Sequence, residues 1–357
     1  MIDIRDLIES IERTVENHNL GRPGSYQRWK WQNHAGTRDL TANAYGCADA
    51  ANILYTIGSL PSDCAGREGF VTSLQSFQDP ATGFFREGSH HPIHTTAHCT
   101  AALELFEARP RFKLGSLSEC RQRRALESFL DRLDWGPNPW HASHRGAGLY
   151  SALVLNGEVS AEWQDWYFDW LWREADPETG FWRKGFVSPQ PARQDGHQAP
   201  LFHHMAGSFH YLFVHEYAHR PLRYPERVID SCMALYRERT IPIPVDQSSV
   251  QAESLPTTYD LGKEIGFAEI DWIYCMNRSR RQTPYRFEEA TEMLLAFSRD
   301  YLAYLCAEVD TAGNDRFNDL HWLFGTTCAL AEIEQALPGF LKSEKPLKLV
   351  LDRRPFI

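Results

Sequence analysis

The chain has 357 residues, a net charge of −10 and 43% hydrophobic residues. This composition is typical of a globular protein and excludes a disordered or collagen-like chain. No stretch reaches the roughly 18 uncharged apolar residues that a membrane-spanning helix needs, so we expect no membrane partner. The acidic balance argues against a nucleic acid as a partner.

The N-terminus and the cysteines indicate the compartment. Acidic residues are mixed into the first ten positions, where a signal peptide would carry basic and then apolar residues; we therefore expect no such peptide. The eight Cys are widely spaced and form no C-x-x-C pair. This pattern predicts reduced thiols in a cytoplasmic protein rather than disulfides or a zinc ribbon.

Charged amphipathic stretches alternate with stretches of small, nearly uncharged residues. The charged stretches are 4–15, 63–78, 118–133, 160–175, 223–240 and 285–307, and the small-residue stretches are 41–57, 94–107, 144–156, 203–218, 263–277 and 319–336. A helix that is small or apolar nearly all round is buried on all sides. The alternation predicts an all-α fold, an (α/α)6 toroid in which six buried helices form an inner ring and six amphipathic helices an outer ring. We expect one domain over residues 1–340 and a short basic tail over 341–357.

The loops alternate in length as well. The links that lead from a charged stretch to a buried one are mostly long, namely 18–40, 79–93, 176–202 and 241–262. Helical hairpins usually have short links. Long loops on one side of each pair therefore predict a functional face over the N-terminal ends of the inner helices.

The sequence also contains a direct repeat. Residues 78–88 (QDPATGFFREG) recur as residues 175–185 (ADPETGFWRKG). The shared Asp-Pro-x-Thr-Gly core is a turn signal, because Pro fixes one dihedral angle and Gly supplies a positive φ. We interpret this turn as structural.

The run 74–84 (LQSFQDPATGF), followed by His94, Thr95, Thr96, Ala97 and His98, resembles a repeat of the α/α toroid proteins. These include terpenoid cyclases, protein prenyltransferases and the six-hairpin glycosidases and lyases. The DxDD and DDxxD motifs of terpene enzymes are absent, and so is the Cys-His pattern of lanthionine cyclases. The resemblance therefore implies a fold and several possible chemistries rather than one.

Histidine and tryptophan gather on the predicted functional face. Twelve of the fifteen His fall in the long loops or in the first turns of the buried helices. Titratable groups collected in one cleft usually mark a site, and a concave site lined by aromatic rings suits a sugar or a prenyl chain. We predict that the substrate-binding residues are Trp31, His94, Trp140, Trp182, His204 and His321.

Carboxylates on the same face are candidates for acid/base catalysis, and among them Asp260, Glu264 and Asp271 would share one helical face. Glycoside hydrolysis usually needs two carboxyl groups about 5 to 9.5 Å apart, and our candidates are Asp39, Asp195 and Glu264, although Asp39 could instead cap a helix. A lyase would use Arg to neutralise a substrate carboxylate and His or Tyr to remove a proton, and His144 with Arg145 fit that alternative. The N-terminal ends of the inner helices would favour an anionic substrate such as a uronic acid.

Two patterns are compatible with a metal. His94 and His98 have the spacing of zinc ligands on a helix, but no third ligand accompanies them in sequence. His215, Glu216 and His219 form a literal HExxH, as in zinc hydrolases, but the motif ends a buried helix away from the predicted face. We predict that the protein uses no metal and no other cofactor.

These observations predict a carbohydrate-active enzyme, a glycoside hydrolase or a lyase, that acts on small molecules or oligosaccharides, including those that contain uronic acids. A zinc-dependent hydrolase that uses the HExxH motif is one alternative. A non-catalytic toroid protein that binds a glycan or an isoprenoid is the other. The oligomeric state stays open.

Overall fold

The computed structural model describes residues 1–187, 199–238, 240–242, 258–309, 315 and 317–357. Within these ranges the chain is mostly helical, which confirms the all-α prediction. The helices are α1 (Arg5–Asn17), α2 (Ala44–Thr56), α3 (Cys64–Ser76), α4 (Pro92–Glu104), α5 (Arg123–Asp131), α6 (Pro139–Leu155), α7 (Ala161–Glu174), α8 (Leu201–Tyr217), α9 (Pro225–Glu238), α10 (Ala268–Arg280), α11 (Phe287–Glu308), α12 (Leu320–Ala336) and α13 (Val350–Arg353).

Strands form two small sheets of two strands each. In one sheet β1 (Ile2–Asp3) pairs in parallel with β4 (Leu341–Lys342), and in the other β2 (Thr240–Pro242) pairs antiparallel with β3 (Thr258–Asp260). Two short 3₁₀ turns, Gly115–Leu117 and Glu119–Arg121, precede α5. None of the helices in the described ranges is long and apolar enough to cross a bilayer.

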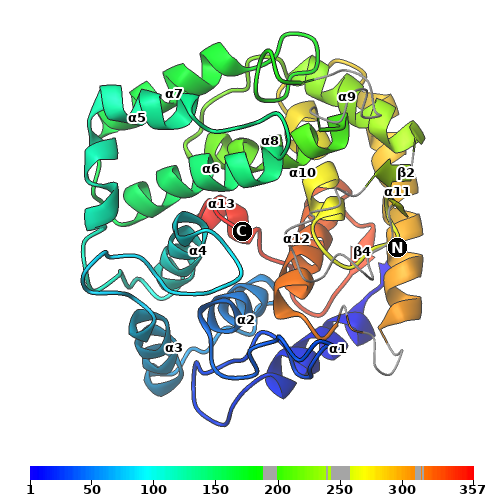
Figure 1. Cartoon of the computed structure of the whole chain (residues 1–357). Coiled ribbons are helices and arrows are strands. Elements are labelled where there is room, and N and C mark those ends of the chain that lie inside the picture. The colour runs from blue at the N-terminus through cyan, green and yellow to red at the C-terminus, as the bar shows by residue number, and fades with distance from the viewer. Residues whose placement is uncertain (188–198, 239, 243–257, 310–314, 316) are drawn as a thin grey trace.

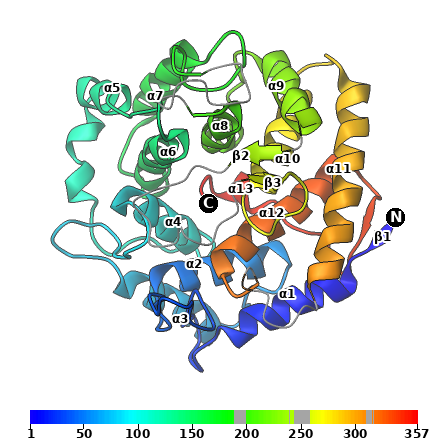
Figure 2. The same cartoon turned by 45° about the vertical axis from the view of Figure 1, so that its right-hand side comes forward.

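Six helices contact one another in cyclic order around a common centre. Helix α2 contacts α4, and the series continues through α6, α8, α10 and α12, which contacts α2 again. Both views show α1, α3, α5, α7, α9 and α11 outside this ring (Figures 1 and 2). The small-residue stretches are therefore the inner helices and the charged stretches the outer ones. Small side chains at the inner positions let neighbouring backbones approach closely on every side.

Side-chain caps mark the start of four inner helices, namely α2, α4, α6 and α12. The side chain of Asn43 accepts a hydrogen bond from the backbone N–H of Gly46 at 2.8 Å, so α2 begins after Asn43. Helix α6 begins at Pro139, five residues before the predicted start of that buried stretch. The reason is local. Asn138 caps the helix, because its side chain accepts a hydrogen bond from the backbone N–H of His141 at 3.1 Å. Proline is well suited to the first helical position, because the N–H that it lacks would have no partner within the helix there.

The two repeated turns have the same geometry. In the first, the N–H of Gly83 donates to the carbonyl of Asp79 at 2.8 Å, and in the second the N–H of Gly180 donates to that of Asp176 at 2.9 Å. The two glycines have φ values of 80° and 79°. A positive φ is the conformation that glycine adopts without strain. The repeat thus encodes a turn, as the sequence indicated.

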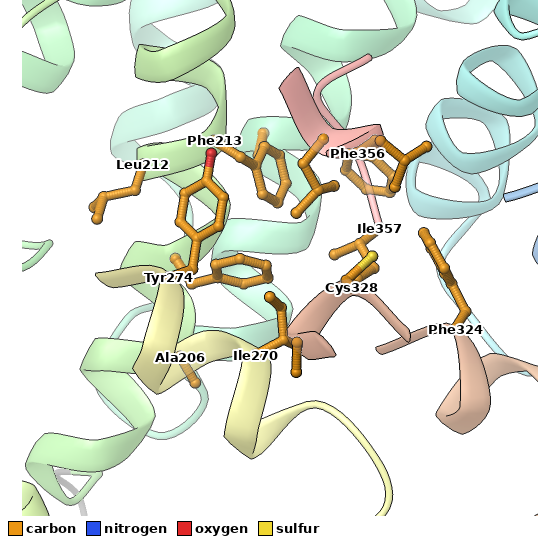
Figure 3. Close-up of a cluster of buried hydrophobic side chains, with 14 of the residues drawn as sticks. Ala206, Leu212, Phe213, Ile270, Tyr274, Phe324, Cys328, Phe356 and Ile357 are labelled. Carbon is orange, nitrogen blue, oxygen red and sulfur yellow. The ribbon is translucent and has the colours of Figure 1, made fainter. Parts of the chain in front are cut away.

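The C-terminal residues enter the centre of the ring, where Figure 1 places the C-terminus. Phe356 and Ile357 are buried, and the ring of Phe356 lies 4.9 Å from that of His94, between centroids. Figure 3 shows both residues among side chains of α8, α10 and α12, including Phe213, Tyr274 and Phe324. This cluster joins the inner helices at the middle of the molecule. All eight Cys are free.

Candidate active site

A cavity of about 300 Å³ lies at the N-terminal ends of the inner helices. Its walls come mainly from the first turns of α4, α6, α10 and α12, and from the segment before α2. It is lined by Arg28, Trp29, Ser89, His90, His94, Trp140, His144, His210, Phe267, Asp271, His321, Trp322 and Ile357. This volume and this mixture of aromatic and polar side chains are typical of a small-ligand site.

Burial keeps four imidazoles of this cavity in the neutral form. Burial lowers the pKa of His94 and of His144 well below the usual value, and it lowers the pKa of His90 to about 4 and that of His210 to about 3. The rings of His94 and His144 meet edge to face with centroids 4.3 Å apart. A neutral imidazole can accept a proton, so the cavity holds several potential bases at neutral pH.

Three of these imidazoles have fixed partners, and Nδ1 of His90 is 2.7 Å from the Ser89 hydroxyl. Nδ1 of His94 shares a hydrogen bond with the Tyr45 hydroxyl, and Nδ1 of His210 shares one of 2.8 Å with the Ser143 hydroxyl. The side chain of His144 makes no hydrogen bond with the described part of the chain, and its ring lies between those of His94 and His210, at centroid distances of 4.3 and 4.5 Å. Its nitrogens are therefore available to a molecule in the cavity.

Arg28 forms a rigid part of the wall. Its Nε and Nη2 donate to the two carboxylate oxygens of Asp319, each at 2.8 Å, and its Nη1 donates to the Ser89 hydroxyl at 3.1 Å. The guanidinium also lies over the Trp29 ring, 4.3 Å from its centroid. Because the guanidinium is already held by Asp319 and Ser89, it loses little side-chain conformational entropy when a ligand binds.

Asp271 contributes the one Asp or Glu side chain to the cavity lining among the described residues. Both of its oxygens are buried without a hydrogen-bond partner in the described ranges. Burial, with a smaller contribution from the charge of Glu269, raises the pKa of Asp271 well above its usual value. Burial therefore favours the protonated form of this group, which can donate a proton to a bound molecule.

A second polar cluster lies deeper in the ring. Oδ1 of Asp49 accepts hydrogen bonds from Nε2 of His98 at 2.8 Å and from Nδ1 of His321 at 3.0 Å. These contacts hold the pKa of Asp49 well below its usual range, whereas burial lowers the pKa of His98 to about 4. Asp49 comes from α2, His98 from α4 and His321 from α12, and His321 also lines the cavity.

The structure brings four of the predicted site residues together. His94, His144, Trp140 and His321 all line the cavity. Asp195 lies outside the described residues. The other predicted residues that the structure describes are not part of the lining, namely Trp31, Asp39, Arg145, Trp182, His204 and Glu264.

Asp39 and Arg145 differ from their predicted positions for local reasons. Asp39 is exposed and accepts hydrogen bonds from the backbone N–H and the hydroxyl of Thr41, four residues before the real cap of α2, which is Asn43. The guanidinium of Arg145 lies 5.8 Å from the ring centroid of Phe129 on α5. Adjacent residues on a helix face different ways, so His144 faces the cavity and Arg145 the outer ring.

His204 and Trp182 lie together behind the inner ring. Nδ1 of His204 is 3.0 Å from the carbonyl oxygen of Trp182, and the indole N–H of Trp182 donates to the carbonyl of Leu171 on α7 at 2.8 Å. Both side chains are buried. Trp31, by contrast, is 40% exposed. Glu264, in the segment before α10, is half-buried.

The HExxH motif lies at the C-terminal end of α8. The helix ends at Tyr217, and His219 follows it with a φ of 52°, so the two His do not share one continuous helical face. Glu216 is 3.1 Å from a guanidinium nitrogen of Arg278 and 3.7 Å from one of Arg281. Among the described residues, the motif belongs to no group of three potential metal ligands.

Sequence reasoning missed Asp49 and Arg28 as parts of this site, and it placed Asp271 on the predicted face without choosing it as an acid/base candidate. Asp49 had a visible signal, because it is the one charged residue of the stretch 41–57. Asp271 was grouped with Asp260 and Glu264 on a presumed helical face, but α10 begins only at Ala268. Arg28 lies in a long loop, where sequence periodicity carries no information on position.

No protein-family model, no curated protein and no solved structure matches this chain.

Proposed function

We propose that the chain is an (α/α)6 toroid of six helical hairpins and that its cavity is the active site of a carbohydrate-active lyase. The substrate would be an oligosaccharide that contains a uronic acid. One observation carries the proposal: a carboxyl group whose burial favours the protonated form and a neutral imidazole line the same aromatic cavity, and neither has a hydrogen-bond partner among the described residues. These are Asp271 and His144.

The reaction would be a β-elimination. His144 would take the proton from the carbon next to the substrate carboxylate, and the electrons of that C–H bond would form a carbon–carbon double bond. The bond to the glycosidic oxygen would break, and Asp271 would give its proton to that oxygen. Proton exchange with water would then restore both groups. General acid/base catalysis of this kind contributes roughly 100- to 10,000-fold to a rate.

The walls of the cavity fit such a substrate. Trp140 and Trp322 offer flat apolar faces for sugar rings, and Nη1 of Arg28 with the Ser89 hydroxyl offers donors for a carboxylate. The N-terminal ends of α4, α6, α10 and α12 add positive potential around an anion.

Elimination fits the described lining better than hydrolysis. Glycoside hydrolysis usually requires a pair of carboxyl groups, and Asp271 is the one Asp or Glu side chain among the described residues that line the cavity. A neutral His in the place of the second carboxylate suits proton abstraction instead.

The test is a panel of oligosaccharides with uronic acid, methyl-esterified uronic acid or only neutral sugars, incubated with the full chain. A lyase releases an unsaturated uronate that absorbs ultraviolet light, from the acidic substrates alone. His144→Gln should abolish this release, whereas His141→Gln, an exposed residue one turn earlier on α6, should not. New reducing ends without ultraviolet absorbance would indicate a hydrolase, and binding without product would indicate a non-catalytic protein; either result contradicts the proposal.

A further inference from the structure

Asp49, His98 and His321 form a buried cluster in which some polar atoms have no hydrogen-bond partner among the described residues. The side-chain atoms that could bind a metal lie within 4.8 Å of one another, and the three residues are at most 4% exposed. Oδ2 of Asp49 and Nδ1 of His98 are buried without a hydrogen-bond partner in the part of the chain that the structure describes. Buried polar atoms are nearly always paired, so two such atoms in one small cluster require an explanation.

We propose that Asp49, His98 and His321 bind one divalent transition-metal ion at the inner end of the cavity. Two imidazoles and one carboxylate are a donor set that suits zinc and divalent iron. Three protein ligands leave at least one coordination position open, as in catalytic rather than structural sites. The structure thereby points to a metal where the sequence alone predicted none.

Rigid neighbours hold the ligands in place. The Tyr45 ring stacks on the His98 ring at a centroid distance of 4.9 Å and meets the His321 ring edge-on at 4.8 Å. The three ligands come from three inner helices that contact one another, α2 with α4 and α2 with α12. A site built on packed helices is preorganised, because its side chains need little rearrangement to meet an ion.

The open position would face the cavity. His321 lines the cavity together with His90 and His94. The spacing of His94 and His98 suggested a shared ion from the sequence, but Nδ1 of His94 is occupied by the Tyr45 hydroxyl, and His98 instead meets Asp49 and His321. An ion at this place would contact an oxygen of a molecule bound in the cavity.

The surrounding charges leave Asp49 free to act as a ligand. Two guanidinium groups, those of Arg28 and Arg354, act on its charge through space. Arg28 is paired with Asp319, and Arg354 lies over the Phe324 ring; neither donates a hydrogen bond to Asp49. The metal site stands on this geometry and does not depend on the proposed reaction.

The experiment measures metal binding without any substrate. The full chain is stripped with a chelator, incubated with Zn²⁺ or Co²⁺, desalted and analysed for bound metal by mass spectrometry. We expect about one ion per chain, a visible absorption band of bound Co²⁺ that reports its ligands, and a higher unfolding temperature with Zn²⁺ than without it. The variants Asp49→Asn and His321→Gln should each weaken binding by at least about 100-fold, since loss of a mere supporting residue already costs roughly 10- to 100-fold.

His210→Gln is the matched control, because His210 is a buried imidazole of the same cavity outside the cluster; it should bind metal like the wild type. Circular dichroism verifies folding, and if Asp49→Asn does not fold, His321→Gln at the cavity wall decides. A wild-type chain that binds no metal would overturn the proposal, as would ligand variants that bind as well as His210→Gln. Because no turnover is measured, failure here leaves the lyase proposal standing, and failure of the lyase leaves the metal site standing.

Discussion

Arg28 and Asp319 are 291 positions apart in the sequence, yet both carboxylate oxygens of Asp319 accept hydrogen bonds from the Arg28 guanidinium at 2.8 Å. The pair joins the loop before the first inner helix to the start of the last one. Next to this pair, Oδ1 of Asn318 accepts hydrogen bonds from the backbone N–H groups of Lys30 and Trp31 at 2.6 and 3.0 Å. The contact therefore joins the segment before α2 to the start of α12, where the first and last inner helices are neighbours. Its Arg28 side also forms part of the cavity wall.

Removing the charge of Asp319 should destabilise the fold strongly. The side chains of the pair are only 8% and 7% exposed, so Asp319→Asn leaves a buried guanidinium without its counter-charge, which typically costs about 3–5 kcal/mol. Denaturant unfolding measures this loss. Asp3→Asn, in an exposed pair with Arg5, is the control and should change stability little. Equal stability of the two variants would show that the buried pair does not fasten the ring.

Glu269 should make stability depend on pH. Burial raises its pKa to about 8 from 4.5, so between these pH values the folded state holds a proton that the unfolded state has lost. Stability is then highest at low pH and falls as the pH rises towards 8, by roughly 1.4 kcal/mol per pH unit. Urea unfolding measures the free energy of unfolding at pH 5 and at pH 8. The decrease between these two pH values should be smaller by ~3 kcal/mol for Glu269→Gln than for the wild type.

The control for this slope is Glu288→Gln, at an exposed position in the first turn of α11, which should keep the wild-type slope. If Glu269→Gln also keeps it, the Glu269 carboxyl is ionised in the folded state and the assignment of its pKa is wrong.

The repeated turn should tolerate no side chain at Gly180. This glycine has a φ of 79°, and a Cβ there would lie 2.7 Å from the backbone nitrogen of Val228. Gly180→Ala combines backbone strain with overpacking and should cost ~2–4 kcal/mol in thermal or chemical unfolding. Gly185 also has a positive φ, of 85°, but a Cβ there would meet no atom within 4 Å. Gly185→Ala should therefore lower the free energy of unfolding by only about 1 kcal/mol. A similar loss in both variants would mean that the close approach to α9 contributes nothing.

The HExxH motif should be dispensable for turnover. Glu216 is ion-paired with Arg278 and Arg281 at the C-terminal end of α8, whereas the cavity lies at the opposite ends of the inner helices. We expect Glu216→Gln to reduce stability but to leave the rate per folded molecule unchanged in the oligosaccharide assay. A rate loss as large as that of His144→Gln would favour the zinc-hydrolase alternative.

The helices could be predicted because their signals are local. Small residues such as those of 41–57 are acceptable on all sides only in an inner helix, and this stretch contains α2. The start of α6 at Pro139 depends on a cap that precedes the small-residue pattern, so the pattern placed it too late. The sequence periodicity predicts that a helix is present and how buried it is, whereas the position of its ends depends on the capping residues.

The site was predicted less completely because its contacts are not local. His144 and Arg145 were paired as neighbours in sequence, but one residue along an α-helix rotates the side-chain direction by about 100°. Asp49 meets His321 across 272 positions and Arg28 meets Asp319 across 291. Such partners become visible only when the inner helices are placed around a common centre.

The rate of product release by Asp271→Asn tests the acid/base account of the cavity most directly. Asparagine has the shape of the protonated acid but no proton to give, so kcat on the acidic oligosaccharide should fall by roughly 100- to 10,000-fold with folding intact. Glu269→Gln is the matched control, since it replaces a buried carboxyl group of the same helix that lies outside the cavity lining, and it should keep the wild-type rate at the same pH. A folded Asp271→Asn protein with wild-type kcat would contradict the account.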